Sequence, residues 1–166
     1  MIGMSPGASW ETKRWPAERF GALASRAADL GFQVVVVGSA SEYELGRQVR
    51  AVEPRAFDLT GRLPLRQLGG FIARCQAFAA NDSGPMHMAR ALGVPTLALF
   101  GSTPPQFDFT GHEVITSTAR CSPCSFYGRP ICPLGHFECM MEIRVEAAWK
   151  SMERLIAAGP RPYLRA

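Results

Sequence analysis

A short polar run, Asn81-Asp82-Ser83-Gly84, separates an apolar segment from a segment with a helical pattern. Gly84 has no Cβ, so the backbone can approach a ligand closely at this point. The free N–H groups that open the following helix, together with its dipole, attract anions. Ser83 adds a hydroxyl donor, and His87 lies in the first turn of the helix. The run therefore predicts a phosphate site at the start of a helix.

Each member of this run also has an ordinary structural explanation. Asn, Asp, Ser and Gly are favoured in any turn between a strand and a helix. Asp82 can accept hydrogen bonds from ribose or sugar hydroxyls, or it can cap the helix. His87 suits a ligand contact, and it equally suits a surface or hydrogen-bonded structural histidine. Taken alone, the run does not decide the chemistry.

A second polar segment lies near the N-terminus and carries positive charge. Lys13 and Arg14 stand just before Trp15-Pro16, with Ser9 and Thr12 as hydroxyl donors. A lysine in such a loop can act as a flexible point charge on a diphosphate, although alone it is typical of a solvated surface lysine. Two loops that each suit a phosphate favour one shared diphosphate site.

Alternating strands and helices must position these two loops. Strands are expected at residues 2–5, 32–37, 57–59, 77–80 and 96–100, and helices at 16–30, 42–52, from about 64, at 85–92 and at 144–158. Ser41 is expected to cap the second helix. This order predicts an α/β fold, a Rossmann-like parallel sheet with helices on both faces, in one domain over residues 1–166. Ligands of such sheets bind beyond the carboxyl ends of the strands, where both polar loops would lie.

The composition of the 166 residues suits a globular domain. Hydrophobic residues make up 47% and charged residues 19% of the chain. A net charge of +4 suits anionic ligands, but it is too small and too evenly spread to indicate nucleic-acid binding. No apolar run approaches the ~20 residues that span a bilayer, and the N-terminus has no signal-peptide pattern. We therefore expect a cytoplasmic protein.

Four of the five cysteines lie in a loosely patterned segment, residues 119–141, which we call the Cys-rich excursion. Cys121, Cys124, Cys132 and Cys139 have the spacing C-x2-C-x7-C-x6-C. Such a set can hold zinc or an iron–sulfur cluster, or it can consist of reduced thiols that pack a loop. In a cytoplasmic protein reduced thiols are favoured, so we expect no metal and no cofactor. Cys75 is typical of a buried structural thiol.

Four motifs occur in a fixed order along the chain. They are Gly7-Ala8-Ser9 with Lys13-Arg14-Trp15-Pro16, Asp58-Leu59-Thr60-Gly61-Arg62, Asn81-Asp82-Ser83-Gly84-Pro85-Met86-His87 with Ala91-Leu92-Gly93-Val94-Pro95, and Leu99-Phe100-Gly101-Ser102-Thr103. Together they resemble the C-terminal half of glycosyltransferase family 9, the ADP-heptose:lipopolysaccharide heptosyltransferases. The resemblance covers nearly the whole chain and is most specific in the Asn-Asp-Ser-Gly-x-x-His run.

This resemblance implies the C-terminal half of a GT-B fold, in which two Rossmann-like domains flank a cleft and the C-terminal one binds the nucleotide sugar. Family members transfer a heptose from an ADP-activated donor to the inner core of lipopolysaccharide, with inversion at the anomeric carbon. The donor-binding set implied by the family pattern comprises Ser9, Lys13, Glu42, Leu63, Asp82, Ser83, Gly84 and His87. In this set Leu63 would pack near the adenine, Glu42 would bind the ribose and Asp82 would meet heptose hydroxyls. Lys13 would contact the diphosphate or the ribose, and the other four would hold the diphosphate.

The resemblance also implies what this chain contributes to transfer. Lys13 and His87 would stabilise the ADP leaving group, without the Asp-x-Asp metal motif that the sequence lacks. The general base is expected in an N-terminal domain, so the chain would bind an ADP-sugar donor but hardly transfer it. A lipopolysaccharide core acceptor would bind only together with that domain. We expect no nucleic-acid partner and at most peripheral membrane contact.

Two other functions stay open on the sequence alone. The chain could be a non-catalytic binding module stabilised by a metal at the four cysteines. It could instead be half of a nicotinamide-dependent oxidoreductase, although no G-x-G-x-x-G lies between the first strand and the first helix.

Overall fold

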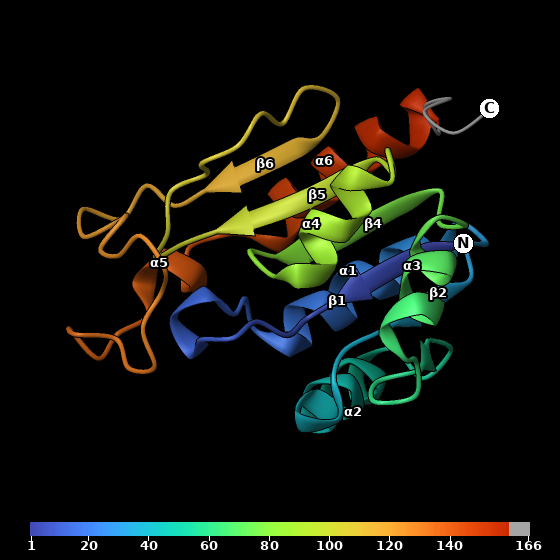
Figure 1. The fold of residues 1–166 in the computed structure, drawn as a ribbon, viewed down its shortest axis with the longest axis horizontal. Helices are drawn as coiled ribbons and strands as arrows, with labels where there is room; N and C mark the ends of the chain where they lie inside the picture. Colours follow the sequence, from blue (N-terminus) through green and yellow to red (C-terminus); the bar gives the residue numbers. More distant parts are fainter. Residues whose placement is uncertain (160–166) are drawn as a thin grey trace.

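Short apolar runs form the strands of one parallel sheet in a computed structural model, which describes residues 1–159 (Figure 1). The strands are β1 (Ile2–Ser5), β2 (Val34–Val36), β3 (Phe57–Asp58), β4 (Ala77–Asn81), β5 (Thr96–Phe100) and β6 (Glu113–Thr116). Their order across the sheet is β3-β2-β1-β4-β5-β6, and every neighbouring pair is parallel. The expected Rossmann-like parallel sheet is therefore confirmed.

The order of the strands reverses between β1 and β4. The chain first winds outward from β1 to β3, and then returns to place β4 on the other side of β1. Ser5 pairs in register with Ala80, so β1 ends one residue before the end of β4. In open parallel sheets, such a reversal opens a crevice at the carboxyl ends of the two strands. Both polar loops found in the sequence leave the sheet at this crevice.

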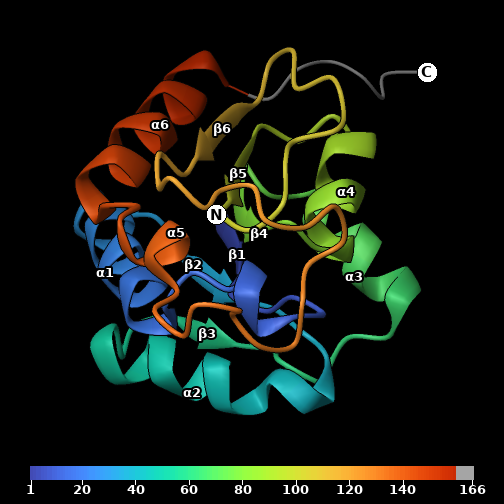
Figure 2. The same cartoon turned by 90° about the vertical axis from the view of Figure 1, so that its left-hand side faces the viewer.

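Helices cover both faces of the sheet (Figures 1 and 2). They are α1 (Ala17–Asp29), α2 (Tyr43–Val52), α3 (Leu65–Ile72), α4 (Gly84–Ala91), the short α5 (Glu138–Met141) and α6 (Val145–Ala158), with 3-10 turns η1 (Glu11–Lys13) and η2 (Ala40–Glu42). Residues of α1 and α6, with Val49 of α2, pack on one face, and residues of α3 and α4 pack on the other. No helix within residues 1–159 is long and apolar enough to cross a membrane.

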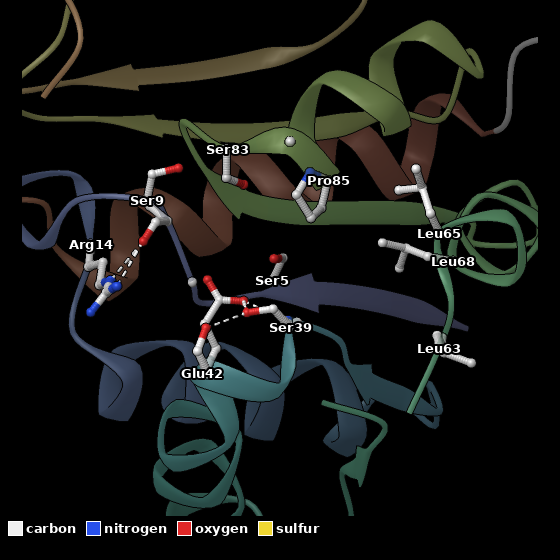
Figure 3. Close-up of a pocket in the computed structure, with 15 residues that line it drawn as sticks. Ser5, Ser9, Arg14, Ser39, Glu42, Leu63, Leu65, Leu68, Ser83 and Pro85 are labelled. Carbon is white, nitrogen blue, oxygen red and sulfur yellow. Dashed lines mark hydrogen bonds between the residues drawn. The ribbon is translucent and has the colours of Figure 1, made fainter. Parts of the chain in front are cut away.

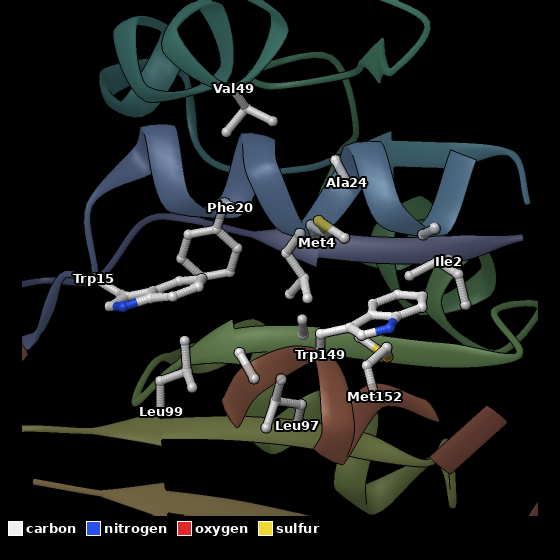
Figure 4. Close-up of a cluster of buried hydrophobic side chains, with 14 of the residues drawn as sticks. Ile2, Met4, Trp15, Phe20, Ala24, Val49, Leu97, Leu99, Trp149 and Met152 are labelled. Carbon is white, nitrogen blue, oxygen red and sulfur yellow. The ribbon is translucent and has the colours of Figure 1, made fainter. Parts of the chain in front are cut away.

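Alternation along the strands divides the core into two layers. In β5, Leu97 and Leu99 point to the layer of α1 and α6, whereas Ala98 and Phe100 point to that of α3 and α4. Figure 4 shows the first layer, in which the two strand leucines lie near Trp15 and Trp149. Each fully buried large apolar side chain contributes about 1.5 to 3 kcal/mol, so these two layers hold the strand ends and their loops in place.

Local structure departs from the sequence expectations at several places, among them the unexpected short helix α5 and a β2 of three residues where six were expected. The helix after β2 is capped by Ser39 and not by Ser41, because it starts with η2, two residues earlier than expected. Ser39 and Glu42 then form a complete capping box, with the glutamate three residues after the cap. Strand β6 was not expected, since its four residues at the sheet edge are only partly buried and carry no strong apolar pattern. The final helix begins at Val145, one residue later than expected.

Candidate functional site

A pocket of about 490 Å³ lies at the crevice between β1 and β4. Its lining comes from the loops after β1, β2 and β4 and from the start of α3. Figure 3 shows Leu63, Leu65 and Leu68 at one end of the pocket, and Ser9 and Arg14 at the other. The pocket is thus apolar at one end and polar at the other. Such a division suits a ligand with a flat apolar ring and a charged tail.

The N-terminus of α4 forms one wall of this pocket. Ser83 is the N-cap residue and Gly84 the first residue of α4. A Cβ added to Gly84 would meet nothing within 4 Å, so the space above this backbone is open. Within residues 1–159, the buried Ser83 hydroxyl has no hydrogen-bond partner. Free helix N–H groups, an unpartnered hydroxyl and open space together make an anion site.

Glu42 forms the opposite wall. Its Oε2 accepts hydrogen bonds from the backbone N–H of Ser39 at 2.7 Å and from the Ser39 hydroxyl at 2.9 Å. A Cβ added to Gly7 would lie 1.9 Å from Glu42 Oε1, so only glycine leaves room for this carboxylate. The capping box therefore fixes Glu42 at the pocket, with its second oxygen directed across to the loop after β1.

A smaller hollow of about 210 Å³ contains the remaining predicted polar groups. Asp82 Oδ2 lies 3.0 Å from Lys13 Nζ and accepts a hydrogen bond from the Thr103 hydroxyl at 2.9 Å. His87 Nε2 lies 3.6 Å from Asp82 Oδ1, and its ring packs edge-on against Phe107. Both ion-pair partners are mostly buried, so their attraction is less screened than on an open surface.

The structure thus divides the predicted residues between two neighbouring spaces. Ser9, Glu42, Leu63, Ser83 and Gly84 line the larger pocket. Lys13, Asp82 and His87 line the smaller hollow. The two spaces meet at the turn between β4 and α4, because Asp82 of that turn lines the hollow and residues 83–84 line the pocket.

Burial lowers the pKa of His87 below its ordinary value of 6.5. The nearby Asp82 carboxylate raises this pKa, while the positive charges of Arg90 and Lys13 lower it. The lowering prevails, so the imidazole is neutral at pH 7 in the unliganded protein. A neutral ring can still donate one hydrogen bond, and an added anion would favour its protonation.

Three residues with clear positions at the site were missed as site residues. Asn81 is fully buried, and its side chain accepts from the Trp15 backbone N–H and donates to the Pro6 carbonyl. Arg14 lines the larger pocket and donates twice to the Ala8 carbonyl. Thr103 holds Asp82 from the loop after β5. In the sequence, Arg14 stands out as the basic neighbour of Lys13, and Asn81 as a polar residue directly after a buried strand.

All five cysteines are free thiols. Burial raises the pKa of Cys75 to about 12, and burial together with the other three thiols of the excursion raises that of Cys139 to about 11. Backbone N–H donors, Phe137 first, lower the pKa of Cys132. Among residues 1–159, no three His, Cys, Asp or Glu side chains are grouped so as to hold a metal ion.

Fold and pocket together define a class of protein, an open parallel α/β domain with its ligand site at the sheet's reversal point. Comparison with known proteins identifies the family within this class. Residues 1–125 match the model of glycosyltransferase family 9 (heptosyltransferase), and the chain belongs to that family.

Relatives of this chain are considerably longer. Lipopolysaccharide heptosyltransferase 2 of Escherichia coli K12 is 42% identical over 113 residues, which are 64% of this chain and 32% of that protein. The solved structure of E. coli ADP-heptose lps heptosyltransferase II has a TM-score of 0.80 at 30% identity, over 95% of this chain and 46% of that one. A family 9 glycosyltransferase from Veillonella parvula has a TM-score of 0.82 at 30% identity, with the same coverage. The chain therefore spans less than half the length of these relatives and matches their C-terminal part.

Proposed function

We propose that this chain is the donor-binding part of an inverting glycosyltransferase that takes an ADP-heptose-type sugar nucleotide for lipopolysaccharide core synthesis. The observation that carries the proposal is the junction of the two spaces at the N-terminus of α4. A nucleotide sugar needs an apolar slot, an anion site and a sugar pocket in that order. The choice of donor is supported by the similarity to the E. coli protein of known structure, an ADP-heptose heptosyltransferase.

Each part of an ADP-sugar has a matching group in this arrangement. The adenine would lie against Leu63 and its neighbouring leucines, and the ribose hydroxyls would donate to the free oxygen of Glu42. The diphosphate would cross the N-terminus of α4, with Ser9 and Ser83 as hydroxyl donors. The sugar would then enter the smaller hollow, where the Asp82 carboxylate accepts hydrogen bonds from its hydroxyls.

Transfer places negative charge on the departing ADP. The helix N–H groups, the Lys13 ammonium and the His87 ring would stabilise that charge without needing to move far. Deprotonation of the acceptor hydroxyl needs a base beside it, which we assign to an N-terminal domain that also holds the lipopolysaccharide acceptor. This chain alone would then bind the donor and hardly transfer it. We place this activity in the cytoplasm, with at most peripheral membrane contact.

Calorimetric titration of the chain with ADP tests the proposal. We expect saturable binding, and we expect Lys13→Met to weaken it about tenfold because a charge-assisted contact to the diphosphate is lost. The matched control is Lys150→Met, which removes an exposed lysine of α6 and should leave ADP affinity unchanged. If the unaltered chain binds no ADP at about 1 mM nucleotide, the proposal fails.

A further inference from the structure

Aromatic side chains line the smaller hollow together with its charged groups. Phe107, Phe126 and Tyr127 line this space together with Lys13 and Asp82. These three rings are 56%, 69% and 82% exposed, respectively. Exposed aromatic rings that gather beside a carboxylate in a hollow mark a surface that a ligand or partner covers.

The Cys-rich excursion brings two of these rings to the hollow. It crosses the carboxyl ends of the strands and approaches the loop after β1 (Figures 1 and 2). Thr12 donates to the Arg129 carbonyl at 2.8 Å and accepts from the Arg129 N–H at 2.9 Å. Gln106 donates to the Phe126 carbonyl at 3.2 Å. The excursion is thus tied to the Lys13 loop on one side and to the Phe107 loop on the other.

The contact between the excursion and the Lys13 loop is close. Gly128 has a positive φ of 91°, and a Cβ added there would lie 2.7 Å from Trp10 Cδ1 and 2.9 Å from Lys13 Cδ. Glycine is therefore required for both the turn and the approach. Because the turn directly follows Tyr127, it fixes where the Phe126 and Tyr127 backbone stands relative to Lys13 and Asp82.

The chemistry of this hollow matches a sugar ring. A pyranose has hydroxyl edges, which donate to a carboxylate, and apolar C–H faces, which pack on the negative faces of aromatic rings. At about 210 Å³ the hollow is below the range of about 300 to 1,000 Å³ typical of drug-sized ligands, so it suits a single ring.

We infer that Phe126 and Tyr127 are specificity-determining contacts for the transferred sugar of the donor. This inference rests on the proposed function, since the sugar reaches the hollow only if the nucleotide occupies the larger pocket. It gives the excursion a role in donor selection that depends on its aromatic residues and not on its cysteines.

The test compares donors with and without the sugar. The full chain is titrated with ADP, ADP-glucose and ADP-heptose, for the unaltered protein, Phe126→Ala and Tyr127→Ala. We expect ADP affinity to change less than about twofold, and affinity for the ADP-sugars to fall about fivefold to tenfold in each variant. Tyr127→Phe keeps the ring and should keep the affinity. Leu134→Ala removes an exposed apolar side chain of the same excursion that lines neither space, and should change nothing.

Each contrary result has a distinct meaning. If ADP and the ADP-sugars bind the unaltered chain and the alanine variants change neither affinity, the rings face a different partner, such as another domain or a membrane, and the inference is wrong. If the variants weaken ADP as much as the ADP-sugars, the rings only support the nucleotide site, and the inference is again wrong. If the unaltered chain binds none of the three ligands, the proposed function itself fails.

Discussion

Lys13 and Asp82 form an ion pair across the junction of the two loops, with Nζ 3.0 Å from Oδ2. Asp82 also receives a hydrogen bond from Thr103 and faces His87. The carboxylate thus offsets the charge that would attract a diphosphate, while its hydrogen-bond partners keep it oriented. The diphosphate of a donor would have to replace Asp82 as the partner of Lys13. A sugar hydroxyl could then donate a hydrogen bond to the Asp82 carboxylate in place of the lysine.

Asp82→Asn should separate these two effects. Removal of one negative charge a few ångströms from the anion site strengthens the attraction for ADP, and we expect its affinity to rise about threefold to tenfold. Affinity for ADP-heptose should rise less or fall, because an amide accepts sugar hydroxyls less strongly than a carboxylate. Calorimetry with both ligands measures the two changes. A loss of ADP affinity in this variant would contradict the role given to the ion pair.

Sequence patterns predicted the parts of this arrangement that depend on neighbours in the chain. The buried strand β5 was found at its observed bounds, because its apolar run and flanking glycines are local signals. The contact of Asn81 with Trp15 joins residues 66 positions apart, and neither local segment contains a pattern that predicts it. The division of the donor-binding set between two spaces could not be predicted from local sequence either, because it depends on how the excursion packs over the strand ends. Ser39 was missed as the cap because Ser41 offered an equally suitable side chain two residues later.

His87 should make donor binding depend on pH. Its pKa lies below 6.5 in the free protein, chiefly because of burial, and a bound diphosphate would raise it. Donor affinity should therefore increase as the pH falls below the His87 pKa of the complex. It should level off once the pH is below the His87 pKa of the free protein. A shift of about one unit corresponds to about tenfold in affinity.

ADP-glucose is the suitable probe for this effect. Each of its phosphates is substituted by one ester and one anhydride bond and so does not titrate near neutral pH, whereas the terminal phosphate of ADP titrates near pH ~6. We expect His87→Gln to remove the increase on acidification below pH 7, and His136→Gln, an exposed histidine of the excursion, to keep it. Equal pH profiles for the unaltered protein and the His87 variant would exclude His87 from the site.

Asn81 should be essential to the stability of the Lys13 loop. Asn81→Ala leaves the Trp15 N–H and the Pro6 carbonyl without their partner in a buried place. We expect the free energy of unfolding to fall by about 2 to 4 kcal/mol, as for other unsatisfied buried groups. Urea denaturation measures this loss, with Gln67→Ala at an exposed position of α3 as control. A loss below about 0.5 kcal/mol would mean that the loop is held by other contacts.

Glu53, which lies outside the candidate site, should make the free energy of unfolding depend on pH in the acid range. Its side chain is 4% exposed, and Arg55 donates from Nε to Oε1 and from Nη2 to Oε2, at 2.8 Å each. These bonds lower the pKa of Glu53 from 4.5 to about 2. Because the folded pKa is depressed, the stabilisation is complete above pH 4.5 and is lost as the pH falls toward 2.

Glu53→Gln should therefore lower the free energy of unfolding at pH 7 by roughly 2 kcal/mol, less than the full pKa shift implies because Arg55 is half exposed to solvent. The difference in the free energy of unfolding between the variant and the unaltered protein should shrink as the pH falls from 4.5 toward 2, because the native carboxylate is then protonated and uncharged as well. Denaturation curves from pH 7 down to the acid limit measure both effects. Glu44→Gln, which removes an exposed partner of Arg47, is the matched control and should leave the curves unchanged. A constant difference at all pH values would show that Glu53 stabilises through packing and not through its charge.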